Sequence, residues 1–262
     1  MKMPVLFVGH GSPMNATRDN EFTRALKRLG RSLPKPRAIL VISAHWETDG
    51  TILTCTARPA KMEDSFSNDP DLTAIRYNPP GAPAQAVALL ATIPFSRLDS
   101  ERGLDHGAWS ILVHLFPCAD VPVFQMSLDR NRTLREANVL GERIRPLREQ
   151  GVLIVGSGNI CHNMRESNFN PHAAPLPWNM QFDEFVAELI RRSELDSLAY
   201  PFKFAPAVAP YALPTNEHYA PFLYSLGAST SEDVIETIYT GYEHAAISLR
   251  SYIWRDKSCS RP

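Results

Sequence analysis

The clearest pattern along the chain is a series of short apolar runs in which polar residues do not alternate. Four of them are rich in β-branched residues and end at turn residues: Val5–Val8, Ala38–Ser43, Val121–Met126 and Val152–Val155. Strands that are covered on both faces have this composition, because neither face needs polar side chains. A fifth candidate strand spans Ala246–Trp254. The pattern predicts the buried strands of one sheet.

Stretches of helical character lie between these runs. Glu21–Leu33 is followed by Pro34-Lys35-Pro36, where proline cannot continue a helix. Further helices are predicted at Ala82–Ala91, Ala108–Phe116, Thr133–Glu149, Gln181–Arg192 and Asn216–Leu226. The alternation indicates an α/β fold with a central, largely parallel or mixed sheet flanked by helices. We expect a single catalytic domain over residues 1–262, with long loops at Ala57–Pro83 and Ser157–Pro177.

Histidines follow three of the predicted strands. His10 comes directly after the first run, His45 follows the second, and His162 follows the fourth after a Gly-Ser-Gly turn. In open α/β sheets, ligands bind beyond the carboxyl ends of the strands. Histidines confined to a core would not share this position, so we expect these three side chains to meet at one site.

Two further histidines have neighbours that suggest chemistry. His106 lies beside Asp105 at the start of a predicted helix. His218 follows Glu217 in the predicted first turn of another helix, with Thr215 or Asn216 as its N-cap. A carboxylate in a first turn is also favoured by the helix dipole, so Glu217 has a purely structural explanation as well.

The remaining histidines carry no such pattern. His114 lies in an apolar run and is predicted to be a core residue, whereas His172 and His244 have no supporting neighbours. Cys161 precedes His162 and raises the alternative of a Cys/His nucleophile. Adjacent side chains usually point in different directions, which disfavours that pairing.

Imidazoles gathered at strand ends indicate a divalent transition metal, because neutral histidine is the commonest ligand of such ions. Two histidines with one more ligand leave coordination positions open. Zinc there would activate water for hydrolysis, whereas ferrous iron would bind a chelating substrate and dioxygen. The residues alone do not choose between these chemistries.

Composition narrows the class of protein. The 262 residues have a formal net charge of -1, so no global field favours nucleic acid or an anionic membrane. No apolar run approaches the length of a membrane span, and Val5–Val8 is too short for the apolar part of a signal peptide. The four cysteines show no C-x-x-C spacing, which fits a reducing cytosol. We expect a cytoplasmic protein without nucleic-acid or membrane partners.

Five motifs follow one another along the chain: GHGSPM at residues 9–14, SAHW at 43–46, DHGAW at 105–109, GSGNICHN at 156–163 and NEHYAPFLYSLGA at 216–228. In this order they resemble the class III extradiol ring-cleavage dioxygenases of the LigB-like family, most closely their DOPA 4,5-dioxygenase branch. Each is weak alone, but together they cover nearly the whole chain. The resemblance implies an enzyme that opens the ring of a catechol, DOPA-like in structure, with O2 and a non-heme metal. The product would be of the muconic-semialdehyde type.

The resemblance also implies roles for the histidines. His10 and His45 match metal ligands, and the third ligand falls in the Glu217-His218 pair, where the EHY stretch favours His218. His162 matches an active-site acid or base that lies close enough to the metal to count among its ligands. His106 matches a second catalytic histidine that touches the substrate. Fe(II) is the cofactor expected for activity.

Substrate contacts are predicted at Ser12, Trp46, Trp109 and Trp178, the aromatic residues as walls for a catechol ring. A zinc-dependent hydrolase that uses the same histidines is the main alternative function, and a metal-binding protein without turnover is a third. Zn(II) can occupy a nitrogen and oxygen site built for iron because its affinity is high. Bound zinc would therefore not distinguish a dioxygenase from a zinc-dependent hydrolase.

Overall fold

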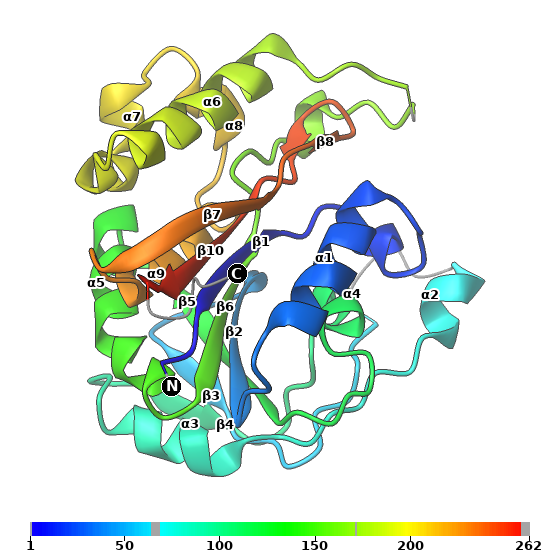
Figure 1. Cartoon of the computed structure of the whole chain (residues 1–262), viewed down its shortest axis with the longest axis vertical. Helices are drawn as coiled ribbons and strands as arrows, with labels where there is room; N and C mark the ends of the chain where they lie inside the picture. The colour runs from blue at the N-terminus through cyan, green and yellow to red at the C-terminus, as the bar shows by residue number, and fades with distance from the viewer. Residues whose placement is uncertain (1, 64–68, 171, 258–262) are drawn as a thin grey trace.

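The computed structural model describes residues 2–63, 69–170 and 172–257. Its centre is an eight-stranded mixed sheet in the order β4-β3-β5-β2-β6-β1-β10-β7 (Figure 1). The strands are β1 (Val5–Gly9), β2 (Ala38–Thr48), β3 (Ile52–Thr54), β4 (Arg97–Asp99), β5 (Val123–Asp129), β6 (Val152–Gly158), β7 (Asp233–Tyr239) and β10 (Ser251–Asp256). A separate hairpin joins β8 (Tyr242–Glu243) to β9 (Ile247–Ser248).

The middle of the sheet is parallel and fully buried. β6 pairs in parallel with β1 on one side and with β2 on the other, and β2 pairs in parallel with β5. Every residue of β1 and β6 is buried. The predicted apolar strands and the mixed α/β sheet are therefore confirmed, and the carboxyl ends of β1, β2 and β6 lie at the same edge.

Helices cover both faces of the sheet (Figure 1). On one face, α1 (Glu21–Ser32) and α4 (His106–Leu115) pack in a core cluster with Leu6 and Val8. On the other, a second cluster with Val5 and Phe7 contains residues of α3 (Pro83–Leu90), α5 (Leu134–Ile144), α6 (Pro177–Arg191) and α9 (Ala220–Ala228). Short helices complete this inventory: η1 (Pro13–Ala16), α2 (Pro70–Ala74), η2 (Arg145–Arg148), η3 (Met164–Glu166), η4 (Leu195–Ala199), α7 (Pro201–Phe204) and α8 (Ala209–Ala212).

Several element boundaries differ from the sequence prediction for local reasons. The predicted helix Thr133–Glu149 is divided because α5 ends at Ile144 and a 3-10 turn containing Pro146 follows. The last helix begins at Ala220, so Glu217 and His218 lie in the turn before it rather than in its first turn. The dipole explanation for Glu217 is thereby wrong. The predicted strand Ala246–Trp254 is two strands, β9 and β10.

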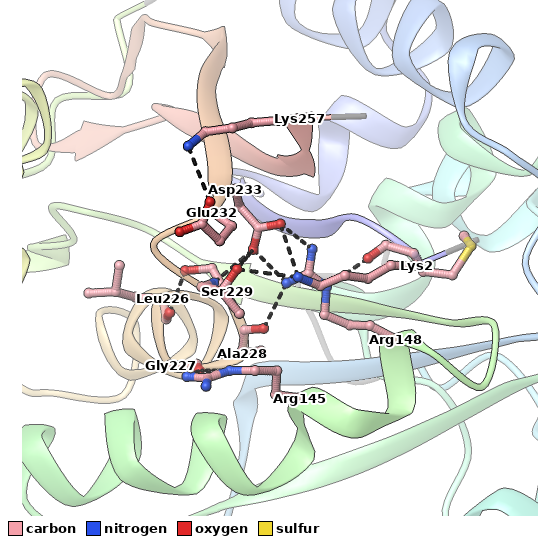
Figure 2. A network of polar contacts seen from close by, with 12 residues as sticks. Lys2, Arg145, Arg148, Leu226, Gly227, Ala228, Ser229, Glu232, Asp233 and Lys257 are labelled. Atoms are coloured by element: carbon pink, nitrogen blue, oxygen red, sulfur yellow. Dashed lines mark hydrogen bonds and ion pairs between the residues drawn. The ribbon is translucent and has the colours of Figure 1, made fainter. Parts of the chain in front are cut away.

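A buried ion pair ties four distant segments together (Figure 2). The Arg148 guanidinium, which is 0% exposed, donates to both carboxylate oxygens of Asp233 at 2.6 and 2.8 Å. It also donates to the backbone carbonyls of Met3 and Ala228. The Ala228 carbonyl is one of the groups that the end of α9 leaves without an intrahelical partner. This network joins the start of the chain, η2, the end of α9 and the start of β7.

We expect Asp233→Asn to lower the free energy of unfolding by about 3–5 kcal/mol, because Arg148 would stay buried without a counter-charge. Burial raises the pKa of Asp233, but the hydrogen bonds and charge of Arg148 outweigh it and lower the pKa overall. The ionised pair therefore stabilises the fold above the unfolded-state pKa of about 3.9 and loses this contribution as pH falls through the lower folded-state value. Urea denaturation of wild type and variant between neutral and acidic pH measures both effects. A stability difference that does not shrink in acid would contradict this account.

In the described part of the chain, no helix combines the length and apolarity needed to cross a bilayer.

Candidate active site

A cavity of about 920 Å³ opens at the carboxyl ends of β1, β2 and β6. Five of its lining residues are histidines: His10, His45, His106, His162 and His244. The other described lining residues are Gly11, Ser12, Pro13, Met14, Arg18, Glu63, Met164, Phe169 and Ile247. His218 lies directly behind this wall, with its ring stacked on that of His162. The structure therefore brings the histidines together at one edge of the sheet, as the sequence predicts.

The order of the strands brings His10 and His45 together. His10 follows β1, and its backbone N–H donates to the Gly158 carbonyl at the end of β6. His45 lies inside β2, which continues further than the sequence predicts. Between Ile42 and Glu47 the pairing of β2 with β5 shifts register. Irregularities of this kind re-aim side chains beside active sites, and here the Nε2 atoms of His45 and His10 lie 3.1 Å apart.

The predicted Gly-Ser-Gly turn is in fact the end of β6, because residues 156–158 stay in the sheet. A Cβ atom at Gly158 would lie 2.1 Å from the His218 carbonyl oxygen, so only glycine allows the two backbones to approach so closely. The same carbonyl accepts a hydrogen bond from the Asn159 N–H at 2.8 Å. The end of β6 therefore holds the backbone of the His218 segment in place.

The hydrogen bonds of His10 determine which of its ring nitrogens carries the proton and which has a free lone pair. Ser157 Oγ lies 2.5 Å from the Gly107 carbonyl and must donate its single proton there, because a carbonyl only accepts. It therefore accepts from His10 Nδ1, 2.9 Å away. The proton of the imidazole is on Nδ1, and the Nε2 lone pair points toward His45.

Glu217 orients His218 in the same manner. Its Oε1 lies 3.1 Å from His218 Nδ1 and 2.8 Å from the Thr215 hydroxyl. Burial raises the pKa of Glu217, but hydrogen bonds, the first of them from His218, prevail and lower it to about 2. The carboxylate therefore accepts the Nδ1 proton of His218. His218 Nε2 is buried and has no hydrogen-bond partner among the described residues, which is the arrangement of a metal ligand with a carboxylate behind it.

The orientations of the ring planes distinguish the imidazoles of His10, His45 and His218 from that of His162. The three are mutually tilted by 49–81°, with centroids 5.0–5.6 Å apart, so their in-plane lone pairs can converge on one point. His162 instead stacks on His218 with an interplanar angle of 6° and a centroid distance of 3.4 Å. Lone pairs in two parallel planes do not converge on one ion at a bond length of about 2.1 Å.

All four of these imidazoles are held in the neutral form that binds metals or accepts protons. Burial, reinforced by the neighbouring histidines, keeps the pKa of His10 and of His45 well below the usual value. Burial also lowers the pKa of His218, despite the opposing Glu217 carboxylate. The pKa of His162 falls to about 3, again mainly through burial. The lone pairs are thus available at neutral pH.

His106 stands at the first position of α4, with Asp105 as the N-cap. Its ring centroid is 3.8 Å from that of His45 and 6.0 Å from that of His10. Asp105 is fully buried and accepts from the Ser43 hydroxyl and from Arg102, which fixes the start of the helix. Donor atoms of His10, His45 and His106 form one compact group, and those of His162, Glu217 and His218 form an adjoining one.

The predicted substrate-contact residues fall into two groups. Ser12 lines the cavity. The three tryptophans are not among its described lining residues, because each packs elsewhere. Trp46 is 5% exposed and lies under the Arg102 guanidinium, Trp109 is 1% exposed with its Nε1 donating to the Met62 carbonyl, and Trp178 packs against a core cluster. Substrate contact by the three tryptophans therefore stays a prediction, and in this structure each packs against other side chains.

The structure also locates Cys161, the nucleophile candidate of the sequence analysis, and His114, the predicted core histidine. Cys161 is buried and its thiol lies 3.5 Å from the Asn179 carbonyl, away from the cavity. Burial raises its pKa well above the usual value, so no Cys/His nucleophile is formed. His114 is buried, as predicted, with Nε2 2.9 Å from the Asn15 carbonyl.

Sequence reasoning missed Arg18 and His244, which both line the cavity. His244 stands at the tip of the β8–β9 hairpin with a φ of 51°, an uncommon left-handed conformation for a residue other than glycine. Neither residue lies beside a recognisable motif. Only the folding of the hairpin against the loop after β1 brings them to the site, although an unusual conformation near a cavity is a signal in the structure itself.

A buried cluster of neutral imidazoles at the carboxyl ends of parallel strands defines a metal-dependent enzyme of the α/β class. Residues 4–248 match the family described as the catalytic LigB subunit of aromatic ring-opening dioxygenase. The chain belongs to this family and is a class III extradiol ring-cleaving dioxygenase, a non-heme metal enzyme.

Individual relatives agree with this assignment. The chain is 38% identical to the 4,5-DOPA dioxygenase extradiol of Escherichia coli K12, covering 95% of this chain and 94% of the relative. It is 32% identical to the protein of the same name from Beta vulgaris, covering 94% of each. The crystal structure of an uncharacterized protein from Escherichia coli K12 superposes with a TM-score of 0.83 at 36% identity, covering 96% of this chain and 99% of that one. The zinc hydrolase alternative is not favoured.

Proposed function

We propose that the enzyme opens the ring of a DOPA-like catechol, with His10, His45 and His218 as ligands of Fe(II). The observation that supports this most directly is the buried Nε2 of His218, which has no partner among the described residues and belongs to a ring 5.0 and 5.6 Å from those of His45 and His10. The 3.1 Å between the Nε2 atoms of His10 and His45 fits two donors of one ion, since bonds of about 2.1 Å at right angles place donor atoms roughly 3 Å apart. The names of the relatives support DOPA as the substrate type.

Ferrous iron at this position would bind both catechol oxygens and dioxygen and would pass electrons between them. The protein supplies the proton transfers. His162 is neutral at working pH and faces the cavity, so it accepts a proton from a catechol hydroxyl and can return it as the ring opens. Its stacking on His218 supports a role as an acid–base group rather than as a fourth ligand.

His106 and Glu217 act beside these residues. His106 contacts His45 on the cavity side, where it can donate a hydrogen bond to bound substrate. Glu217 is a positioning residue, because it holds the Nδ1 proton of His218 and so turns Nε2 toward His10 and His45. We infer a single catalytic domain, since the ends of strands, the start of α4 and the turn before α9 all contribute to one site beside a single main sheet. The free cysteines Cys55, Cys118 and Cys161 are consistent with a cytoplasmic location.

The test is to strip the protein with a chelator, reload it anaerobically with Fe(II) or Zn(II), and add DOPA and air. We expect oxygen uptake and a yellow ring-opened product with iron and neither with zinc. Product mass and NMR then give the position of cleavage. Hydrolysis of an ester or amide by the zinc form, with no oxygen uptake by the iron form on any catechol, would overturn the proposal.

A further inference from the structure

Near the imidazole of His244, the lining of the cavity holds one strongly basic side chain, and both side chains approach Glu243 Oε1. Arg18 follows η1, on the loop that begins at His10, and is the one lysine or arginine among the described lining residues. Its side chain is 46% exposed. One of its terminal nitrogens donates to Glu243 Oε1 at 3.0 Å. A guanidinium has five N–H donors, so the bond to Glu243 uses only part of the hydrogen-bonding capacity of Arg18.

Glu243 is a fixed anchor for this arginine. Its side chain is only 11% exposed, and its Oε2 accepts from the Ser12 N–H at 2.6 Å and from the Asn15 amide at 3.2 Å. Gly11, with a φ of 61°, makes room for it, because a Cβ atom there would lie 2.4 Å from Oε2. Since the carboxylate charge is shared among three donors, Glu243 holds Arg18 in place without saturating it.

The apolar lining residues of the cavity are Pro13, Met14, Met164, Phe169 and Ile247. The acidic lining residue Glu63 is paired with Lys61 at 2.7 Å, which offsets its repulsion of an anion. Arg18 keeps N–H donors beyond the one that Glu243 accepts. The cavity of about 920 Å³ also lies at the upper end of the range for drug-sized ligands, which leaves space for a substituent on the ring.

We propose that Arg18 is a specificity-determining residue that binds the carboxylate of the substrate's side chain, while the imidazole cluster holds the ring. The preferred substrates are thus catechols that carry a side-chain carboxylate. This inference rests on the proposed function for the identity of the ring. Arginine presents paired donors that match the two oxygens of a carboxylate, and the Glu243 contact holds its orientation.

The test compares two catechols on the full-length iron-loaded enzyme: 3,4-dihydroxyphenylpropionate, which has the carboxylate, and 4-methylcatechol, which does not. We expect Arg18→Met to lower kcat/KM for the carboxylate substrate about 10- to 100-fold, mainly through KM, because a charge-assisted hydrogen bond is lost. The value for 4-methylcatechol should change less than about twofold. Arg18→Lys should be intermediate, since it keeps the charge and loses the planar fork.

Arg24→Met is the matched control. Arg24 is an exposed arginine of α1 paired with Asp19 and is not a described lining residue, so both substrates should behave as with wild type. Equal losses on the two substrates with Arg18→Met, or no loss on either, would overturn the inference. Anaerobic titration of the zinc-loaded protein with the same two compounds separates the two proposals. If the carboxylate compound binds more tightly and Arg18→Met removes this difference, the inference is supported even if the wild-type enzyme turns over neither compound. The absence of turnover would count against the proposed function alone.

Discussion

His218→Ala is expected to lose stoichiometric iron and with it more than about 10³-fold of the ring-cleavage rate, since the chemistry depends on the metal. The reason is that Nε2 of His218 is a buried donor without a partner among the described residues, in a ring 5.6 and 5.0 Å from those of His10 and His45. His10→Ala should behave in the same way. Metal content after gel filtration, oxygen uptake and the far-UV circular dichroism spectrum are the measurements, the last to show that the fold is intact.

Glu217→Gln distinguishes the two candidates for the third ligand. If Glu217 only orients His218, the variant keeps one iron per chain at saturating metal, with about 10- to 100-fold weaker affinity. Retention of iron and activity by His218→Ala, together with their loss in Glu217→Gln, would instead make Glu217 the ligand. His172→Ala replaces an exposed histidine and is the control that should leave both quantities unchanged.

His162→Gln is expected to lower kcat by about 10²- to 10⁴-fold, the usual contribution of a positioned acid–base group. Iron should remain at one per chain, because the His162 ring lies parallel to that of His218 and its lone pair does not converge with the other three. Single-turnover absorbance of the anaerobic catechol complex would show substrate bound before oxygen is added, so a loss of proton transfer is separated from a loss of binding.

Loss of iron in His162→Gln would show that His162 is a ligand and that its stacked geometry does not persist when metal is bound. His172→Gln removes an exposed imidazole outside the site and is the control for the loss of a histidine in itself.

The sequence predicted the buried strands and the histidines at their carboxyl ends well, because these signals are local. A run such as Val152–Val155 indicates a strand buried on both faces wherever it occurs, and a histidine after it necessarily lies at the carboxyl edge. β3, β4 and β7 were missed. β3 and β4 have three residues each, and β7 is partly exposed with Glu236 on it, so their apolar signal is weak.

The details of the site depended on contacts that no local pattern encodes. Whether Glu217 or His218 faces the other imidazoles follows from the 3.1 Å contact between them and from the turn that precedes α9. The tryptophans looked like cavity walls because aromatic residues suit a catechol, yet burial in the core satisfies Trp109 equally well. Arg18 and Glu243 are 225 positions apart, so only the folded chain relates them.

The three proposed ligands are also spread along the chain, at positions 10, 45 and 218, so no fragment brings them together before the central sheet has formed. An ion held there is a cross-link between the first strand, the second strand and the turn before the last long helix. Because the unfolded chain has no such site, each increment of bound metal shifts the folding equilibrium toward the native state, by about 2.7 kcal/mol when free metal is one hundred times the dissociation constant. For this enzyme, the supply of metal would contribute to the stability of the folded protein as well as to its rate of catalysis.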